Sequence, residues 1–252
     1  MDVDTNQPLG TPTWLDLGVP DLDRARDFYG PVFGWDFVVG PEEYGDCTTC
    51  LLRGRAAAAL TTEYEASSGP AWRVYLATPD CDDTVRQVRQ SGGDVLVEPT
   101  DVGDQGRMAF ARDPTGGVFG LWQGGAHPGC QVVNEPGSLV RNDLVTPDPG
   151  PAREFYAAVF DFTLDGNPDM PGFDFTFLRR PDGHEIGGIM GAPGSSSAWA
   201  TTFEVAGTNE AVDRAVAHGG SSDGATDFLY GRLATITDPF GAEFSIITRP
   251  AP

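Results

Sequence analysis

The chain of 252 residues contains a long internal repeat, and this feature limits its possible folds more than any other. Phe28-Tyr29 recurs as Phe155-Tyr156, an offset of 127 positions. After a loop that is two residues shorter in the second copy, GRMAFARDPTGGVFG matches GRLATITDPFGAEFS at an offset of 125. Further matches are Trp14-Leu-Asp-Leu with Arg141-Asn-Asp-Leu, Ala71-Trp72 with Ala198-Trp199, and Ser91-Gly-Gly with His218-Gly-Gly. Each copy is about the size of one domain, so two similar domains are expected.

The two copies define the expected domain boundaries. Residues 1–10 form an N-terminal tail, 11–124 the first domain and 138–250 the second. The segment 125–137 between them is rich in Gly and Pro and lacks hydrophobic periodicity. Such a composition indicates a linker.

Hydrophobic periodicity predicts the same order of elements twice in each copy. In the first copy, 13–19 alternates as a strand, Asp21 is a candidate helix N-cap, and an apolar stripe at helical spacing runs to Gly34. Three short strands follow. A second strand over 72–77, a helix over about 82–90 and three closing strands complete the copy. Each copy is therefore predicted to hold two βαβββ modules.

Two segments of each copy resemble the vicinal-oxygen-chelate superfamily of glyoxalases, bleomycin-resistance proteins and extradiol dioxygenases. VPDLDRARDFYGPVFGW and TPDPGPAREFYAAVFDF are similar to its first-helix signature, and ARDPTGGVFGLW and ITDPFGAEFSII to its closing hairpin. The resemblance is closest to a two-domain, glyoxalase-like or hydroxylase-like branch found in actinobacteria, sometimes among secondary-metabolite genes. It implies an α+β fold of two tandem domains, in which paired βαβββ modules form a curved mixed sheet. The sheet is a cup with helices outside and a metal or ligand inside.

The same resemblance places metal ligands on the first, fourth, fifth and last strands of the two modules, and this chain departs from that pattern. The corresponding residues of the second copy are Arg141, Gly188, Ala200 or Trp199, and Ser245, and those of the first copy are Trp14, Ala59, Arg73 or Trp72, and Gly120. Metal sites need imidazole, carboxylate or thiolate donors, which these positions lack. We therefore expect no metal and no cofactor.

The histidines do not fill the gap. His127 falls in the linker, His184 in a turn and His218 at a helix end, so each is expected to be solvated or to cap a helix. Cys47 and Cys50 form a C-x-x-C, but they are predicted to lie on a strand, where residues three apart point to opposite faces. Structural thiols are favoured over a zinc or redox site.

Strand alternation predicts which side chains line each cup. The first cup is expected to be aromatic, with Asp16 on its floor and a wall of Trp14, Trp72 or Arg73, Tyr75, Gly120 and Trp122. The second is expected to be more polar, with Arg141, Asp143, Glu243, Ser245 and Trp199 or Thr201. Gly120 stands where a metal-binding Glu is expected, which leaves open space there.

The charge of the chain excludes several kinds of partner. It has 16 arginines, no lysine and 37 acidic residues, which give a formal charge of −21. Nucleic acid and anionic membrane surfaces are repelled by such a chain. No secretory signal or membrane span is recognisable, which favours a cytoplasmic protein, either a monomer or a homodimer.

Four functions remain open at this stage, one of which, a purely structural or interaction module, leaves the aromatic cup unexplained. The leading hypothesis is a metal-independent binding protein whose aromatic first cup holds a flat hydrophobic metabolite or antibiotic, for sequestration, resistance or tailoring. The second is a metal-free isomerase, lyase, hydrolase or hydroxylase-type enzyme with Asp16 or Asp143 as base and Arg73 or Arg141 as oxyanion stabiliser. Both aspartates could equally have structural roles. The third is a metalloenzyme with unusual ligands such as Asp143 and Glu243.

Overall fold

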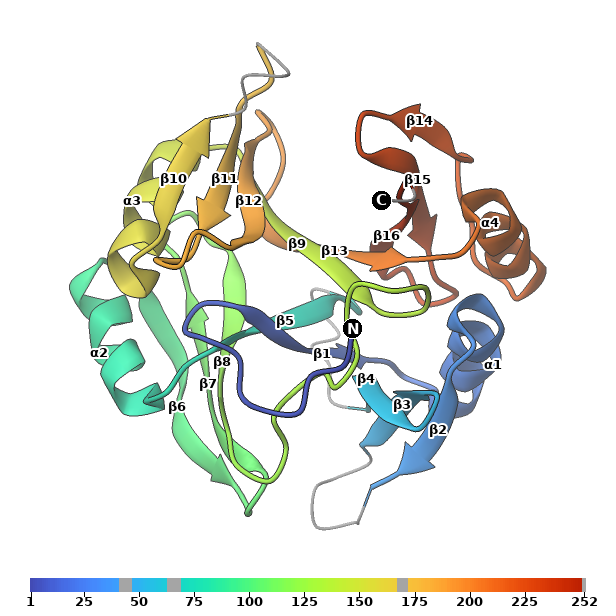
Figure 1. Cartoon of the computed structure of the whole chain (residues 1–252), viewed down its shortest axis with the longest axis horizontal. Helices are drawn as coiled ribbons and strands as arrows, with labels where there is room; N and C mark the ends of the chain where they lie inside the picture. Colours follow the sequence, from blue (N-terminus) through green and yellow to red (C-terminus); the bar gives the residue numbers. More distant parts are fainter. Residues whose placement is uncertain (41–46, 63–68, 167–171, 251–252) are drawn as a thin grey trace.

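The computed structural model describes residues 1–40, 47–62, 69–166 and 172–250. Within them the chain forms two eight-stranded mixed sheets and four helices, one sheet from each sequence copy. Each sheet is built from two modules of the order βαβββ (Figure 1). The predicted α+β architecture is confirmed. None of the described helices has the length and apolar character needed to cross a bilayer.

The first sheet has the strand order β2-β3-β4-β1-β5-β8-β7-β6. The antiparallel pair β1 and β5 joins its two modules at the centre. Its elements are β1 (Pro12–Gly18), α1 (Leu22–Phe33), β2 (Asp36–Val39), β3 (Thr48–Leu52), β4 (Arg55–Thr61), β5 (Trp72–Ala77), α2 (Cys81–Gln90), β6 (Asp94–Val102), β7 (Gly106–Arg112) and β8 (Val118–Gly124).

The second sheet repeats this topology as β10-β11-β12-β9-β13-β16-β15-β14. The central antiparallel pair is β9 and β13. Its elements are β9 (Leu139–Thr146), α3 (Pro149–Phe160), β10 (Thr163–Gly166), β11 (Phe175–Arg179), β12 (Glu185–Gly191), β13 (Ala198–Glu204), α4 (Thr208–Ala217), β14 (Thr226–Phe228), β15 (Gly231–Thr237) and β16 (Glu243–Thr248).

Local sequence explains the first helix of the chain. The Asp21 carboxylate accepts a hydrogen bond from the backbone N–H of Arg24 at 2.9 Å, which confirms Asp21 as the N-cap. The helix ends at Gly34, whose φ of +74° is a left-handed conformation that glycine adopts at little cost. Ala25, Phe28, Tyr29 and Val32 form its buried face.

The helix-covered faces of the two sheets pack against each other and share one hydrophobic core. Helix α1 lies beside α4, and α2 beside α3, so each pair joins the two domains (Figure 1). The concave faces of the sheets point away from this core on opposite sides of the molecule. We call the concave face of β1–β8 the first cup and that of β9–β16 the second cup.

The repeated Phe-Tyr and Asp-Pro motifs meet across the domain boundary. The hydroxyl of Tyr29 donates to Asp238 Oδ2 at 2.9 Å, and that of Tyr156 donates to Asp113 Oδ2 at the same distance. Burial raises the pKa of both tyrosines well above the usual value, so each phenol keeps its proton. We call these the reciprocal Tyr–Asp pairs.

The phenylalanines of the same motifs make a second reciprocal contact. A Cβ at Gly93 would lie 2.7 Å from the ring of Phe155, and a Cβ at Gly220 would lie 2.7 Å from the ring of Phe28. Each repeated Gly-Gly turn therefore lets the ring from the other domain approach its backbone. The motifs hold the two domains together as well as shaping each one.

The reciprocal Tyr–Asp pairs predict that Tyr29→Phe and Tyr156→Phe each lower the free energy of unfolding by about 1–3 kcal/mol, because a buried carboxylate oxygen loses its donor. Urea denaturation measures the loss. Tyr230→Phe is the control, since Tyr230 is 43% exposed, and it should cost less than about 0.5 kcal/mol. Equal stability of all three variants would contradict the role of these pairs.

Candidate functional site

A row of four residues crosses the floor of the first cup. Trp14 stands opposite Tyr75, Tyr75 opposite Gly120, and Gly120 opposite Phe110, on the neighbouring strands β1, β5, β8 and β7. Trp14, Tyr75 and Gly120 are buried and Phe110 is half-buried. A Cβ at Gly120 would lie 2.3 Å from the Tyr75 ring. The expectation that Gly120 opens free space is wrong, because that ring occupies the space.

Asp16 is held by two neighbours on the floor of the first cup. The Tyr75 hydroxyl donates to its Oδ2 at 2.6 Å, and the Arg73 guanidinium pairs with its Oδ1. The same guanidinium lies over the Phe110 ring, 5.5 Å from the centroid. Burial raises the pKa of Tyr75, so its phenol stays a donor. These contacts support the structural role of Asp16 over the role of a base.

The linker enters the first cup and closes it. The ring centroid of His127 lies 4.3 Å from that of Trp14 and 5.6 Å from that of Trp122, and the Trp122 indole donates to the His127 carbonyl at 2.9 Å. Burial lowers the pKa of His127 to about 4. The expectation of a solvated His127 is therefore wrong. His184 is exposed, and exposed His218 contacts the Arg214 carbonyl at a helix end, as expected.

The rest of the linker runs between the beginnings of β1 and β4. The N–H of Cys130 donates to the Thr13 carbonyl at 2.6 Å, and that of Gln131 to the Ala56 carbonyl at 2.7 Å. Burial raises the pKa of the Cys130 thiol to about 12. The first cup is thus a closed cluster, whose buried members are Trp14, Ala56, Ala59, Tyr75, Trp122 and Cys130.

Two tryptophans expected on cup walls lie in the core between the domains. Trp72 packs at 5.1 Å from the ring of Phe203, and the Trp199 indole donates to the Tyr156 hydroxyl at 2.9 Å. Thr201 also faces the core. In the first copy Arg73, and not Trp72, faces the cup. In the second copy Ala200, an alternative for the metal-ligand position, lies on the cup face, whereas the wall alternatives Trp199 and Thr201 do not. Cys47 and Cys50 lie on opposite faces, as predicted.

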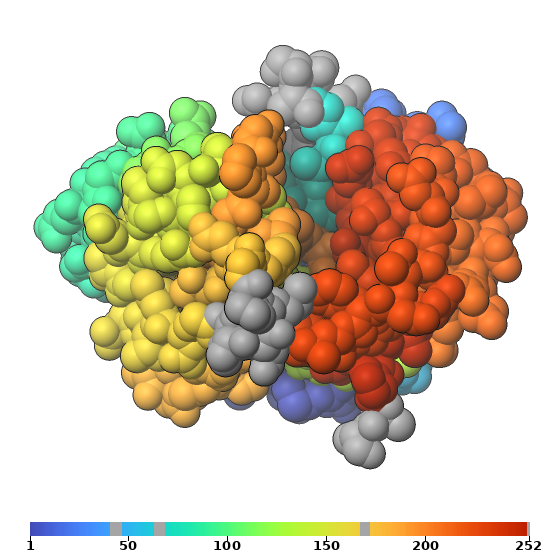
Figure 2. Space-filling model, turned by 90° about the horizontal axis from the view of Figure 1, so that it is seen from above, coloured from blue at the N-terminus to red at the C-terminus, as the bar shows by residue number. Residues whose placement is uncertain are grey.

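The second cup is open. Ala198 and Ala200 are exposed although they lie on β13, a central strand. From above, the surface is hollowed between the yellow-to-orange strands β10–β12 and the red strands β14–β16 (Figure 2). A row equivalent to that of the first cup crosses its floor as Arg141, Thr202, Ser245 and Thr235. We call these four residues the polar row.

Arg141 is fixed by two carboxylates. Its Nε lies 2.9 and 2.8 Å from the two oxygens of Asp143, and its Nη1 donates to Glu185 at 2.7 Å. Burial raises the pKa of Asp143, although Arg141 opposes that shift. Burial lowers the pKa of Arg141, but the two carboxylates outweigh this and the net shift is upward. The guanidinium remains charged.

Aromatic side chains form the walls of the second cup. Phe173, Phe175 and Phe177 make a ladder with ring separations of 6.1 and 5.0 Å, and Arg141 lies over Phe175 at 5.4 Å. On the opposite wall, Phe228 stands on β14 opposite Gly231 and is 45% exposed. The predicted cup walls did not include these strands, because the prediction covered only the positions equivalent to metal ligands and their neighbours on the central strands.

The residues of neither cup fit a metal ion. Within the described ranges, no three His, Cys, Asp or Glu side chains come together as a ligand group. In the second cup, Asp143 and Glu185 are already paired with Arg141, and Glu243 stands exposed on β16. In the first cup the Asp16 carboxylate is paired with Arg73 and Tyr75. The indole, phenol, guanidinium and hydroxyl groups of the two floors are poor ligands for transition metals.

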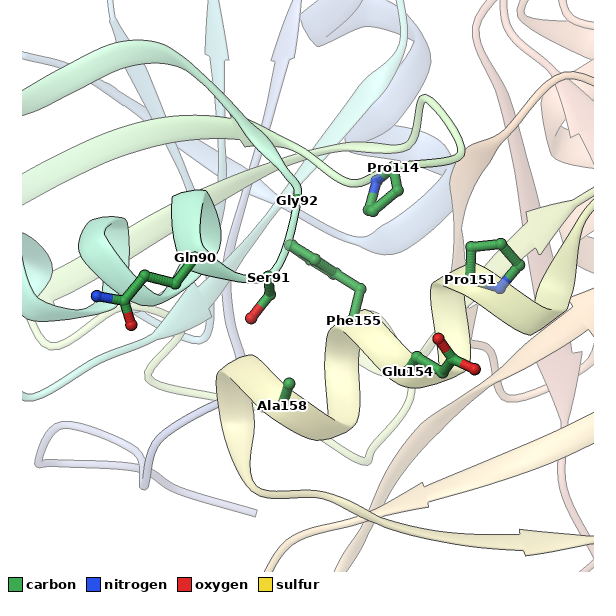
Figure 3. Close-up of a pocket in the computed structure, with 8 residues that line it drawn as sticks. All are labelled: Gln90, Ser91, Gly92, Pro114, Pro151, Glu154, Phe155 and Ala158. Atoms are coloured by element: carbon green, nitrogen blue, oxygen red, sulfur yellow. The ribbon is translucent and has the colours of Figure 1, made fainter.

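Two other hollows lie outside the cups. One of about 470 Å³ separates α2 from α3, where Phe155 points towards the turn at Ser91 and Gly92 (Figure 3). The other, about 300 Å³, lies between Pro8-Leu9 and Asp161. The first is lined mainly by apolar and neutral side chains, with Glu154 as its charged group. The second is lined by three charged residues, of which Arg180 is already paired with Asp182.

The closed first cup predicts that Gly129→Ala displaces the linker. Gly129 has φ of +106°, and a Cβ there would lie 2.3 Å from the Thr13 carbonyl oxygen. Gly194→Ala is the matched control, because Gly194 has φ of +87° and no neighbour within 4 Å. Gly129→Ala should cost about 1–3 kcal/mol more in urea unfolding than the control and increase acrylamide quenching of tryptophan fluorescence. Equal quenching in both variants would contradict the conclusion that the linker closes the first cup.

Comparison with known proteins identifies the family. The model of the Glyoxalase/Bleomycin resistance protein/Dioxygenase superfamily matches residues 11–121 and again 135–246. CFP32 of Mycobacterium bovis, provisionally named a glyoxylase, is 37% identical and the alignment covers 96% of each chain. The anthracycline biosynthesis protein DnrV of Streptomyces peucetius is 36% identical, with 94% of this chain and 93% of that protein covered.

Solved structures show the same fold at low sequence identity. The Mn(II)-bound glyoxalase of Novosphingobium aromaticivorans superposes with a TM-score of 0.69 at 18% identity, covering 97% of this chain and 89% of that one. The 2,3-dioxygenase LapB of Pseudomonas sp. KL28 gives 0.67 at 16% identity, covering 98% and 96%. The resemblance inferred from the helix and hairpin motifs is confirmed, and the chain belongs to the Glyoxalase/Bleomycin resistance protein/Dioxygenase superfamily.

Proposed function

We propose that this protein binds a flat aromatic metabolite in its second cup without a metal ion. The observation that carries the proposal is the contrast between the cups: one is filled by its own aromatic side chains and the linker, the other is open between aromatic walls. Concave sites with apolar walls and a few fixed polar groups are typical for small molecules. We therefore propose the second cup as the binding site, in place of the first cup that Trp14 and Trp122 indicated.

The names of two relatives support a ring-fused aromatic ligand. DnrV and the similar protein DauV of Streptomyces sp. strain C5 are both named as anthracycline biosynthesis proteins. Anthracyclines contain flat, fused aromatic rings, and a flat ring system gains most from stacking on phenyl faces. Phe175 and Phe177 on one wall and Phe228 on the other are the aromatic groups that would contact the rings of such a compound. By holding such a compound, the protein would sequester it or present it to a tailoring enzyme.

The proposal predicts that a bulky side chain in the second cup blocks binding. Ala200 is exposed on the floor beside Asp143, so Ala200→Trp should weaken binding of a hydroxyanthraquinone probe at least tenfold. Ala217→Trp, an exposed substitution at the end of α4, is the control and should bind like the parent chain. The absorbance change of the probe on titration gives the affinity. Unchanged affinity in Ala200→Trp would place the ligand elsewhere.

The raised pKa of Asp143 favours one alternative, a metal-free enzyme that uses this carboxylate as a base. Arg141 lies against it and could stabilise a developing oxyanion.

This alternative predicts turnover that survives a chelator and is lost in Asp143→Asn. Because the pKa of Asp143 is raised, turnover should fall as the pH drops through a value above the usual 3.8 of a free carboxyl. Asp27→Asn, an exposed change on α1 in the first domain, is the control and should keep turnover. Chromatography of aromatic substrates incubated with each variant is the measurement. Turnover by Asp143→Asn at the parent rate would remove Asp143 as the base.

A further inference from the structure

The polar row forms a continuous line of hydrogen-bonding groups. Its members stand directly opposite one another on β9, β13, β16 and β15, so their side chains share the concave face. Neighbouring strands are about 4.8 Å apart, which gives the row a length of roughly 14 Å. Such a line matches an extended molecular edge better than a single polar group.

The groups of this row are available to a ligand. In the described part of the chain, no protein hydrogen bond involves the hydroxyls of Thr202, Ser245 and Thr235, or Nη2 of Arg141. Thr202 and Ser245 are half-buried. Thr235 is exposed, so all of these groups can bond with water or with a ligand.

Arg141 makes one end of the polar row chemically different from the other. Asp143 and Glu185 take the N–H groups of Nε and Nη1, which fixes the guanidinium plane and leaves Nη2 for another acceptor. Guanidinium N–H groups only donate, whereas a hydroxyl can donate or accept. The acceptor with most negative charge, a carbonyl, phenolate or enolate oxygen, therefore belongs at the Arg141 end.

The first cup shows that the fold itself does not require a polar row. The equivalent positions hold Trp14, Tyr75, Gly120 and Phe110, and these pack into a closed cluster. Three hydroxyl-bearing residues and an arginine at the same positions of the second cup are therefore specific to the open site.

We infer that the ligand of the second cup is a ring-fused aromatic compound that carries several carbonyl or hydroxyl oxygens along one edge. This inference rests on the proposed function. The oxygenated edge of the ligand lies along the polar row, so its two ends reach towards Phe175 and Phe177 beyond Arg141 and towards Phe228 beyond Thr235. A hydrocarbon of the same shape would leave the row without partners and bind less well.

Two isomeric probes test the inference. In one dihydroxyanthraquinone both hydroxyls flank the same carbonyl, so three oxygens share one edge; in its isomer one hydroxyl stands beside each carbonyl, so the oxygens are divided between two edges. The parent chain should bind the one-edge isomer about five- to tenfold more tightly, since one more oxygen faces the row and one additional hydrogen bond forms.

Variants of the row connect this preference to its residues. Thr202→Val and Ser245→Ala should each weaken binding of the one-edge isomer about fivefold and affect the other isomer less. Thr62→Val, an exposed change in the first domain, is the control and should leave both affinities unchanged.

The outcomes separate the two proposals. Equal binding of both isomers that Ala200→Trp still blocks would overturn the polar-row inference and leave the proposed function intact. Binding of neither isomer would overturn both. A parent preference that survives in Thr202→Val and in Ser245→Ala would overturn the assignment to the polar row.

Discussion

The back-to-back packing of the two sheets is the constraint on which the rest of the structure depends. One core forms from the helix-covered faces of both domains, and the reciprocal Tyr–Asp pairs tie it together at two equivalent places. In each pair the aspartate also shapes its own hairpin, as Asp113 does by accepting from the N–H of Gly117. Since this arrangement uses one face of each sheet, the concave faces point outwards and remain available for a ligand. The reciprocal Tyr–Asp pairs thus help to fix which face of each sheet is packed in the core and which face is left for a site.

Much of the fold could be predicted from the sequence, because it depends on local signals that occur twice. The repeat defined two copies, and alternation and capping placed the strands and the first helix, with Asp21 as its N-cap. The roles of the repeated motifs could not be predicted in the same way. Tyr29 meets Asp238 only after the two domains pack, and no local pattern encodes that contact. The path of the linker was missed for a related reason, since His127 is half-buried against Trp14, which is distant in sequence.

The site was predicted in part. Alternation correctly grouped Arg141, Asp143 and Ser245, yet it could not say which cup was open. Trp14 and Trp122 indicated an aromatic pocket, but aromatic side chains fill space as readily as they line it, and volume can be judged only from coordinates. Choosing Trp199 or Thr201 on β13 was wrong by one residue, which in a strand reverses the face and places both in the core. The same fold has therefore produced a packed cup and an open one from two copies of one sequence pattern.

The most direct test of this account is a crystal structure of the chain with a bound dihydroxyanthraquinone. The account predicts density for the compound in the second cup, between Phe175 and Phe228, with His127 still packed against Trp14 in the first. Density in the first cup with His127 displaced would contradict it.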